Sequence, residues 1–407
     1  MSTVATTRPR HLRLVTPLPR LGVRTQGKAT TRRTVTLLLG STALLVVGGT
    51  IMVLSASSVT AFAKYGDSFV YFQRQATYTI IGAAALFLTS RMRYDAWRRL
   101  ALPSLGLTVV LLAVVLHPAH GIEAYGSSRW FSVGPFTVQP SEIAKLAAVV
   151  FAATILDRKW GKLDDLGHLA LPLLPVAMLL CGMIMLQPDL GTTLIIAGTL
   201  LMMLFVAGVR LRYLTLATVV GGLVGAGLIM SADYRRVRFL SFLHPWQDVK
   251  NTGYQLAQSL IALGSGGWTG VGLGASRQKW AYVPNAHTDF IFSILGEELG
   301  LIGEILVLAA FGVLLFAGVR IAASAKDVFG RLLAAGIVCW FGLQALINLG
   351  AVTGLLPITG VPLPFLSYGG SSLVVSLAGV GILVNIAVTS QREADRVTRS
   401  ATRSRTA

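Results

Sequence analysis

The chain is short of charged residues, of cysteine and of acidic side chains. Charged residues make up 13% of its 407 residues, whereas soluble domains carry about a quarter. The two cysteines, Cys181 and Cys339, both lie in apolar stretches, so we expect buried, reduced thiols. This scarcity excludes a soluble domain and a disulfide scaffold, and no cysteine spacing indicates a metal or redox site.

Apolar sequence dominates instead, at 54% hydrophobic residues and a mean hydropathy of +0.68. Apolar runs long enough to span a bilayer recur along the chain. Backbone N–H and C=O groups inside a bilayer must be hydrogen-bonded within the protein, which favours helices. We therefore predict an all-α integral membrane protein with about ten transmembrane helices. The expected spans are 34–56, 75–90, 98–117, 140–156, 169–187, 190–208, 212–231, 289–318, 332–353 and 371–389.

The basic residues predict how the chain lies in the membrane. With the N-terminus inside, 25 of the 35 Lys and Arg residues fall on inside segments and nine on outside segments. Both termini are therefore expected in the cytoplasm, with 232–288 as a large extracytoplasmic loop between helices 7 and 8. The basic tails, 1–33 and 391–407, are expected to be disordered and to flank a membrane domain at 34–390. The net charge of +18 thus encodes topology, and no nucleic-acid partner is expected.

The outside segments are rich in Gly, Pro and aromatic residues, which favours ordered turns. They comprise 118–139, 232–288 and 354–372. Within the long loop, 254–263 places three leucines on one helical face, which predicts a short helix at the membrane surface.

Asp289 lies where the long loop meets the eighth expected span. A carboxylate at such a boundary suits a general base, but Asp is also a common helix N-cap. His287 and Thr288 suit a turn, and His287 with Asp289 could share a divalent cation, although two ligands are a weak metal signal. The residues alone leave these alternatives open.

Other ionisable residues lie inside expected spans, where charges are costly and often functional. Glu142 and Lys145 are three residues apart on one helical face, so they either form a structural pair or serve function. Asp189 suits an N-cap after a proline. Glu297 and Glu298 cannot both share the face of Asp289, so at least one is expected to contact another helix or backbone.

Basic residues on the outside segments are candidates for binding a phosphate-bearing lipid head group, and solvated loop charges are the alternative. They are Arg129, Arg235, Arg236, Arg238, Arg277 and Lys279.

Four motifs together resemble the SEDS family (shape, elongation, division and sporulation) of membrane proteins, over about residues 34–390. They are GSSRWFSVGPFTVQPSEIAK (126–145), LQPDLGTT (186–193), PNAHTDFIFSILGEELGLIG (284–303) and GVPLPFLSYGGSS (360–372). Asn285 departs from the pattern, because many relatives carry Glu there.

The resemblance implies a peptidoglycan glycosyltransferase that polymerises lipid II on the outer face of the bacterial cytoplasmic membrane. It also implies a class B penicillin-binding transpeptidase as partner. Asp289 matches the family's essential aspartate and is the expected catalytic residue and a candidate ligand for Mg²⁺ or Mn²⁺. The expected substrate-binding residues are Arg129, Glu142, Lys145, Arg235, Arg236, Lys279, His287 and Ser367.

The amino-acid sequences of the motifs resemble those of the division members of the family more than those of the elongation members. We therefore expect septal localisation with other cell-division membrane proteins. An elongation polymerase, a lipid II flippase or other transporter, and a non-catalytic division scaffold remain as alternatives.

Overall fold

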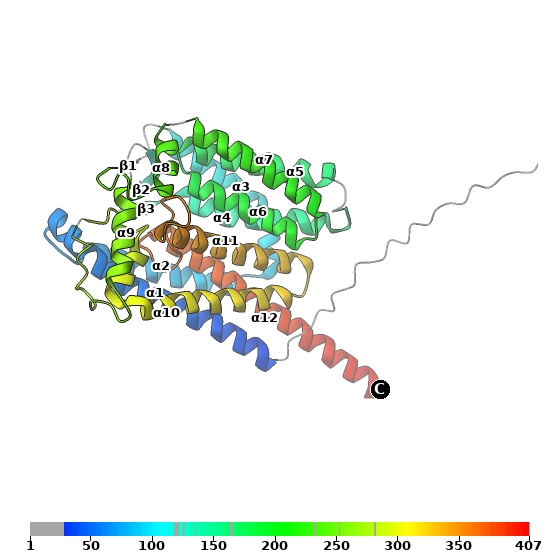
Figure 1. Ribbon diagram of the computed structural model, residues 1–407. Helices are drawn as coiled ribbons and strands as arrows, with labels where there is room; N and C mark the ends of the chain where they lie inside the picture. Colours follow the sequence, from blue (N-terminus) through cyan, green and yellow to red (C-terminus); the bar gives the residue numbers. More distant parts are fainter. Residues whose placement is uncertain are drawn as a thin grey trace, which may run out of the picture.

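The computed structural model describes residues 28–117, 122–124, 127–134, 136–162, 166–231, 233–251, 253–280 and 282–406. Long helices lie side by side in a bundle (Figure 1). The short strands, α8 and α9 gather at one end, and the marked C-terminus lies at the other. The helices are α1 Lys28–Tyr65, α2 Val70–Arg91, α3 Tyr94–Leu116, α4 Pro140–Arg158, α5 Leu166–Leu186, α6 Leu190–Val206, α7 Leu211–Met230, α8 Asp233–Leu243, α9 Tyr254–Ser265, α10 Ile291–Ala323, α11 Val328–Val352 and α12 Gly370–Thr406.

Each expected span falls on one helix, α1 to α7 or α10 to α12. Six of these helices are long and apolar enough to cross a membrane, namely α1, α3, α7, α10, α11 and α12. The protein is therefore a multi-pass membrane protein. α5 and α6 contain shorter apolar stretches. α4 carries charged side chains but is buried along most of its length, so little of it needs to be compatible with lipid.

α10 is interrupted at Gly300, which the apolar pattern did not indicate. Gly300 has φ +64° and ψ −167°, a conformation that essentially only glycine adopts. The freed carbonyls of Glu297 and Glu298 accept hydrogen bonds from Val271 N and Gly272 N at 2.9 and 3.0 Å. The first two N–H groups after the break donate back to residues 267 and 268 at 3.0 and 3.2 Å. The loop thus satisfies the backbone groups that the break exposes.

The outside segments contain more regular structure than the expected turns. β1 Ile122–Ala124, β2 Ser127–Val133 and β3 Phe136–Val138 form an antiparallel sheet in the order β1-β2-β3. α8 was not expected, because its sequence is short and polar. The helix expected at 254–263 is confirmed as α9, which packs on α10 through a 2.7 Å contact between the hydroxyls of Ser259 and Ser293.

The C-terminal tail differs from the expected disorder. α12 continues to Thr406, well past the expected span end at 389. No Gly or Pro occurs after Gly381, so nothing in this stretch interrupts a helix. The N-terminal tail lies outside the described residues up to position 27, and α1 begins at Lys28.

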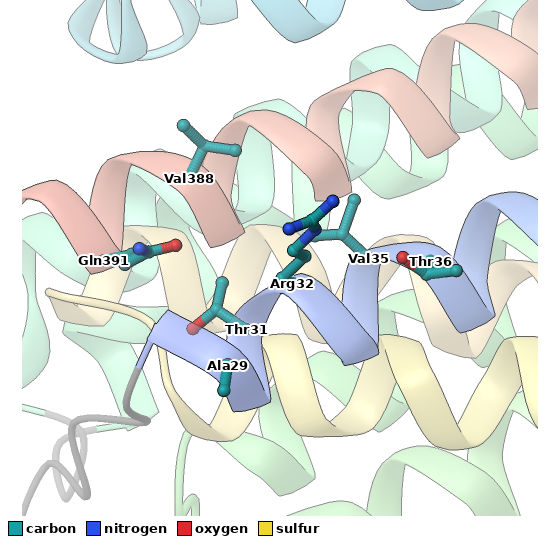
Figure 2. Close-up of a pocket in the computed structure, with 7 residues that line it drawn as sticks. All are labelled: Ala29, Thr31, Arg32, Val35, Thr36, Val388 and Gln391. Atoms are coloured by element: carbon teal, nitrogen blue, oxygen red, sulfur yellow. The ribbon is translucent and has the colours of Figure 1, made fainter.

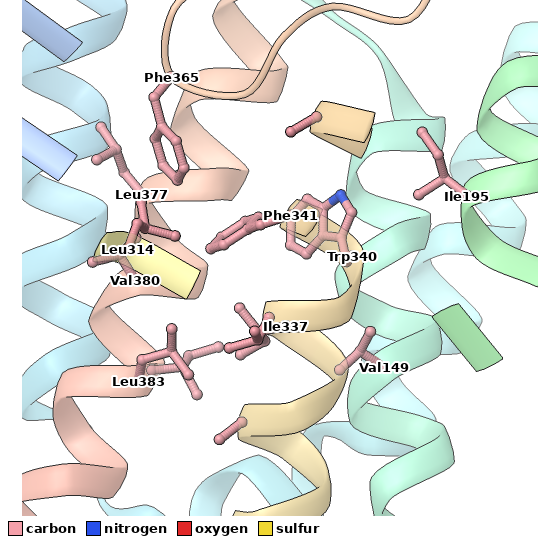
Figure 3. Packing of buried hydrophobic residues seen from close by; sticks show 14 of the residues in the cluster. Val149, Ile195, Leu314, Ile337, Trp340, Phe341, Phe365, Leu377, Val380 and Leu383 are labelled. Carbon is pink, nitrogen blue, oxygen red and sulfur yellow. The ribbon is translucent and has the colours of Figure 1, made fainter. Parts of the chain in front are cut away.

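α11 lies at the centre of the packing. Figure 3 shows Ile337, Trp340 and Phe341 of α11 among buried side chains from neighbouring elements. Those neighbours include Val149 of α4, Ile195 of α6, Leu314 of α10, Phe365, and Leu377, Val380 and Leu383 of α12. Tight packing holds α11 in one position, which matters because its next two turns carry the polar groups described below.

Candidate functional site

Asp289 lies just before α10 and does not occupy the N-cap position. The N-cap residue is Phe290, which makes no side-chain capping bond, and the helix begins at Ile291. The backbone carbonyl of Asp289 accepts a 2.8 Å hydrogen bond from the Asn348 side chain. A methyl group added at Gly360 would lie 3.5 Å from Asp289 Oδ2, so the carboxylate faces the 360–369 loop. Asp289 is therefore not the N-cap residue of α10, and its catalytic role stays a prediction.

A compact turn sets the position of Asp289. Asn285 has φ +55°, a left-handed conformation that Asn tolerates better than most residues. Its carbonyl accepts hydrogen bonds from the backbone N–H groups of Thr288 at 3.1 Å and Phe290 at 3.4 Å. The departure from Glu at this position therefore suits the local backbone.

His287 belongs to an aromatic cluster that joins two of the motifs. Its ring lies 4.7 Å from the Tyr71 ring and 5.5 Å from the Tyr368 ring. Its carbonyl also accepts a 2.9 Å hydrogen bond from Tyr368 N. Burial lowers the pKa of His287 to about 4, so the imidazole is neutral near pH 7. The 284–290 turn is thus held against the 360–369 loop.

Two amides on α11, Gln344 and Asn348, connect these segments. Asn348 Nδ2 donates to the carbonyl of Asp289 and also to that of Val361 at 2.7 Å. Gln344 Nε2 donates to the carbonyl of Pro362 at 2.9 Å. The sequence reasoning missed both residues. Their signal was a pair of amides four residues apart, on one face of an otherwise apolar helix.

Glu142 and Lys145 form an ion pair inside the bundle. Lys145 Nζ lies 2.7 Å from Glu142 Oε2, and both residues are at most 2% exposed. Lys145 also donates to Gln344 Oε1 at 2.7 Å and lies over the Trp340 ring at 5.3 Å. The interpretation of a structural pair is confirmed. Substrate contact by either residue stays a prediction.

The β2 strand is attached to the α5–α6 turn. Asp189 caps α6, accepting hydrogen bonds from Thr192 N at 3.0 Å and Thr192 Oγ1 at 2.8 Å, as expected. Arg129 donates through Nε to the carbonyl of Gln187 at 3.0 Å and through one Nη to that of Pro188 at 2.6 Å. Gly191 packs directly against Val361, so this turn adjoins the loop that faces Asp289.

The acidic pair on α10 is bound to the long loop and to α1. Glu297 accepts hydrogen bonds from the Ser276 hydroxyl and from Arg277 N, the latter at 2.9 Å. Glu298 accepts hydrogen bonds from Ser55 Oγ at 2.6 and 2.8 Å and lies 3.6 Å from Lys279 Nζ. The expectation that at least one contacts another helix or backbone is confirmed for both. Lys279 is buried, and its charge is used inside the fold.

The other expected substrate-binding residues lie in different surroundings. Ser367 is buried, and its hydroxyl accepts a 2.8 Å hydrogen bond from Leu363 N, which closes the 363–367 turn. Arg236 is exposed and pairs with Asp233 at 3.0 Å. The side chains of Arg235 and Arg238 lie outside the described ones. Among the described residues, no three His, Cys, Asp or Glu side chains form a potential metal site.

Comparison with known proteins gives consistent matches. The family model described as "Cell cycle protein", which covers FtsW, RodA and SpoVE, matches residues 35–392. A probable peptidoglycan glycosyltransferase FtsW of Geobacter metallireducens is 46% identical, over 83% of this chain and 90% of the relative. Stage V sporulation protein E of Bacillus subtilis is 45% identical, over 86% and 96%.

Solved structures show the same architecture. A chain from a solved structure described as "Structural coordination of polymerization and crosslinking by a peptidoglycan synthase complex" aligns with this chain with a TM-score of 0.73 and 29% identity. The alignment covers 87% of this chain and 97% of the other. The rod shape determining protein RodA of Thermus thermophilus aligns with a TM-score of 0.63 at 29% identity, over 86% and 95%.

Proposed function

This chain belongs to the family of cell cycle proteins that comprises FtsW, RodA and SpoVE, and we propose that it polymerises lipid II into glycan strands for septal wall synthesis. The activity is that of a peptidoglycan glycosyltransferase, the name its FtsW relatives carry. One observation supports the assignment of the site. The 284–303 and 360–372 motifs meet at Asp289, whose carboxylate faces the 360–369 loop and whose main chain is bound by Asn348, and the 186–193 motif packs on the same loop through Gly191.

The reaction joins the 4-hydroxyl of an acceptor sugar to the anomeric carbon of a donor. In our proposal, an Asp289 carboxylate oxygen takes the proton of that hydroxyl while its oxygen attacks the anomeric carbon. The bond from that carbon to the lipid pyrophosphate breaks, and the pyrophosphate leaves with the electron pair. Direct displacement inverts the centre, so an α-linked donor becomes a β-linked polymer.

Arg129 is proposed to stabilise the charge on the leaving group. Its Nε and one Nη bind the carbonyls at the end of α5, which holds the planar guanidinium in place. Its other Nη makes no hydrogen bond among the described residues, and we propose that it binds a pyrophosphate oxygen. Lys279 is less suited, because it is buried against Glu298.

A divalent cation is proposed only as part of the bound substrate. Asp289 is a single carboxylate, and a site of three acidic, His or Cys ligands is absent from the described residues. Mg²⁺ typically binds one or two carboxylates together with substrate phosphates, which fits Asp289 beside a lipid pyrophosphate. The proton and leaving-group steps above do not depend on this ion.

We also propose the membrane arrangement that this chemistry needs. Ten helices cross the bilayer, both termini lie in the cytoplasm, and the end with β1–β3, α8 and α9 is extracytoplasmic, supported by the distribution of Lys and Arg. Cysteines placed near residues 127 and 276 should react with an impermeant reagent from outside only. Reaction from outside near residue 326 would contradict the arrangement.

A class B penicillin-binding transpeptidase and other cell-division membrane proteins are the proposed partners, at the division septum. The solved relative from a peptidoglycan synthase complex supports a partner of this kind. A lipid II transporter is less consistent with the site. The charges that would line a path are used internally, since Glu142 pairs with Lys145 and Asp189 caps α6.

The test of the function is Asp289→Asn in the purified complex with its transpeptidase. Asn keeps the size and the backbone bond to Asn348, but its amide cannot take a proton. Loss of a general base typically lowers rates about 10²–10⁴-fold. Polymerisation of labelled lipid II should fall by this factor while lipid II binding persists. Long glycan made at the normal rate by the variant would reject Asp289 as the base.

Asp289→Ala serves as a second variant in the same assay. If Asp289 is the base, both variants should lose synthesis to a similar degree while inserting into membranes normally. Transport of labelled lipid II across liposomes without any glycan product would instead identify a transporter. Normal cell division with either variant would favour a scaffold.

A further inference from the structure

A pocket lies between the first and last helices, near the start of α1 and the middle of α12 (Figure 2). Its volume is about 480 Å³, within the range of small-ligand sites. Arg32 lies 23 residues before Ser55, the α1 residue bonded to Glu298, which is roughly 35 Å along the helix. The polymerase chemistry therefore does not use this pocket. Its lining residues are Ala29, Thr31, Arg32, Val35, Thr36, Val388 and Gln391.

The lining has a polar level and an apolar level. α1 and α12 run in opposite directions here, so Arg32 and Gln391 lie nearer the chain ends, and Val35 and Val388 lie about one turn deeper. The expected membrane spans begin at 34 and end at 389, between these two levels. With these expected span limits, the pocket would cross the boundary between head groups and hydrocarbon on both helices.

Within the part of the chain that the structure describes, no side chain neutralises the charge at the polar level. Arg32 is exposed and has no hydrogen-bond or ion-pair partner among the described residues, and the lining contains no acidic side chain. In Figure 2, Arg32 extends from α1 toward α12. A cation would be repelled here, and a wholly apolar ligand would leave the guanidinium unpaired. The chemistry suits an amphiphile with an anionic head.

We propose that this pocket binds an anionic phospholipid of the bilayer. Its phosphate accepts hydrogen bonds from Arg32, with the Gln391 amide at the same level, and its chains begin beside Val35 and Val388. In the proposed orientation the lipid comes from the cytoplasmic leaflet. This binding site is separate from the glycosyltransferase site and does not depend on the role of Asp289.

The test uses the full chain, purified in a neutral detergent at about 0.15 M salt. Binding of phosphatidylglycerol and of phosphatidylcholine with the same chains is measured by native mass spectrometry. Arg32→Gln is compared with Arg33→Gln, which removes the same charge one residue later, at an exposed position outside the pocket. Val388→Trp fills the deeper level without changing charge.

We expect the protein to prefer phosphatidylglycerol. Arg32→Gln should weaken that binding about ten- to hundredfold, the effect of one charge-assisted phosphate contact. Arg33→Gln should weaken it by at most about fivefold, the general attraction of one basic residue near a membrane surface. Val388→Trp should reduce binding of both lipids.

Equal weakening by Arg32→Gln and Arg33→Gln would overturn the proposal, because it would leave only general surface attraction. Equal binding of the two lipids, or unchanged binding in Val388→Trp, would also overturn it. Displacement of the lipid by inorganic phosphate at a comparable concentration would identify a free-anion site rather than a lipid site. None of these outcomes bears on Asp289.

Discussion

Asn348→Leu tests whether the α11 amide holds the main chain of Asp289. The side chain is 2% exposed, and its Nδ2 donates to the carbonyls of Asp289 at 2.8 Å and Val361 at 2.7 Å. Both acceptors are carbonyls, so the nitrogen has to face them. Leucine keeps a similar volume and removes both donors.

The expected loss of stability follows from these contacts. The buried carbonyl of Val361 and the partly buried carbonyl of Asp289 each lose a donor, at up to about 1–3 kcal/mol each. The substitution also removes Asn348 Oδ1, a buried atom without a hydrogen-bond partner among the described residues, which offsets about 1–3 kcal/mol. The net loss should therefore be about 1–3 kcal/mol. In the proposed mechanism Asp289 is the base, so the glycosyltransferase rate should fall about a hundredfold, because a displacement of about 1 Å of a catalytic group costs about this much.

Asn385→Leu is the matched control. Asn385 is 5% exposed, its Nδ2 donates to the carbonyls of Ser90 at 2.9 Å and Met92 at 2.8 Å, and its Oδ1 likewise lacks a partner. These bonds lie at the α2–α3 connection rather than at Asp289. Thermal unfolding in detergent and lipid II polymerisation are measured for both variants. Equal loss of activity in the two, or full activity of Asn348→Leu, would refute the positioning role.

Three further predictions concern other parts of the fold. Glu142→Gln leaves Lys145 buried without its counter-charge and should cost about 3–5 kcal/mol of stability. The double variant Glu142→Gln, Lys145→Met should restore most of this loss. A double-mutant cycle in thermal unfolding measures the difference. Gly300→Ala should strongly destabilise the fold, because its methyl would lie 2.7 Å from Thr269 N and the backbone there has φ +64°. Gly312→Ala on the same helix should be tolerated, because nothing lies within 4 Å of the added methyl. Similar melting temperatures for the two variants would contradict the break at Gly300. The folded pKa of His287, about 4, lies below its usual 6.5, so the unfolded chain binds the proton first and stability should fall as pH drops from about 6.5 to 4. The slope should reach about 1.4 kcal/mol per pH unit and should be smaller in His287→Phe, and equal slopes would show that other groups titrate.

The membrane class and the location of the helices were predictable from the sequence. A bilayer requires apolar segments of fixed length with closed hydrogen bonding, so each span leaves a local signal in its own residues. All ten expected spans fall on helices for this reason. The leucine periodicity at 254–263 likewise predicted a helix, which the structure has as α9. The Asp189 cap and the Glu142–Lys145 pair were also found, because their partners lie within four residues along the chain.

The arrangement around Asp289 was decided only by tertiary contacts. Asn348 reaches Asp289 across 59 positions, and Lys145 reaches Gln344 across 199, so no local pattern records either contact. The break at Gly300 could not be predicted from hydropathy, because hydropathy describes the side chains and not the backbone conformation. The backbone groups that the break frees are hydrogen-bonded to a loop that is distant in sequence. Lys279 was interpreted as an outside cation for a similar reason, because this loop residue is buried against Glu298 of α10 and Ser55 of α1, which are distant in sequence. Partners far apart in sequence meet only when the helices pack, and packing decides which polar groups are paired within the fold and which remain to meet a substrate.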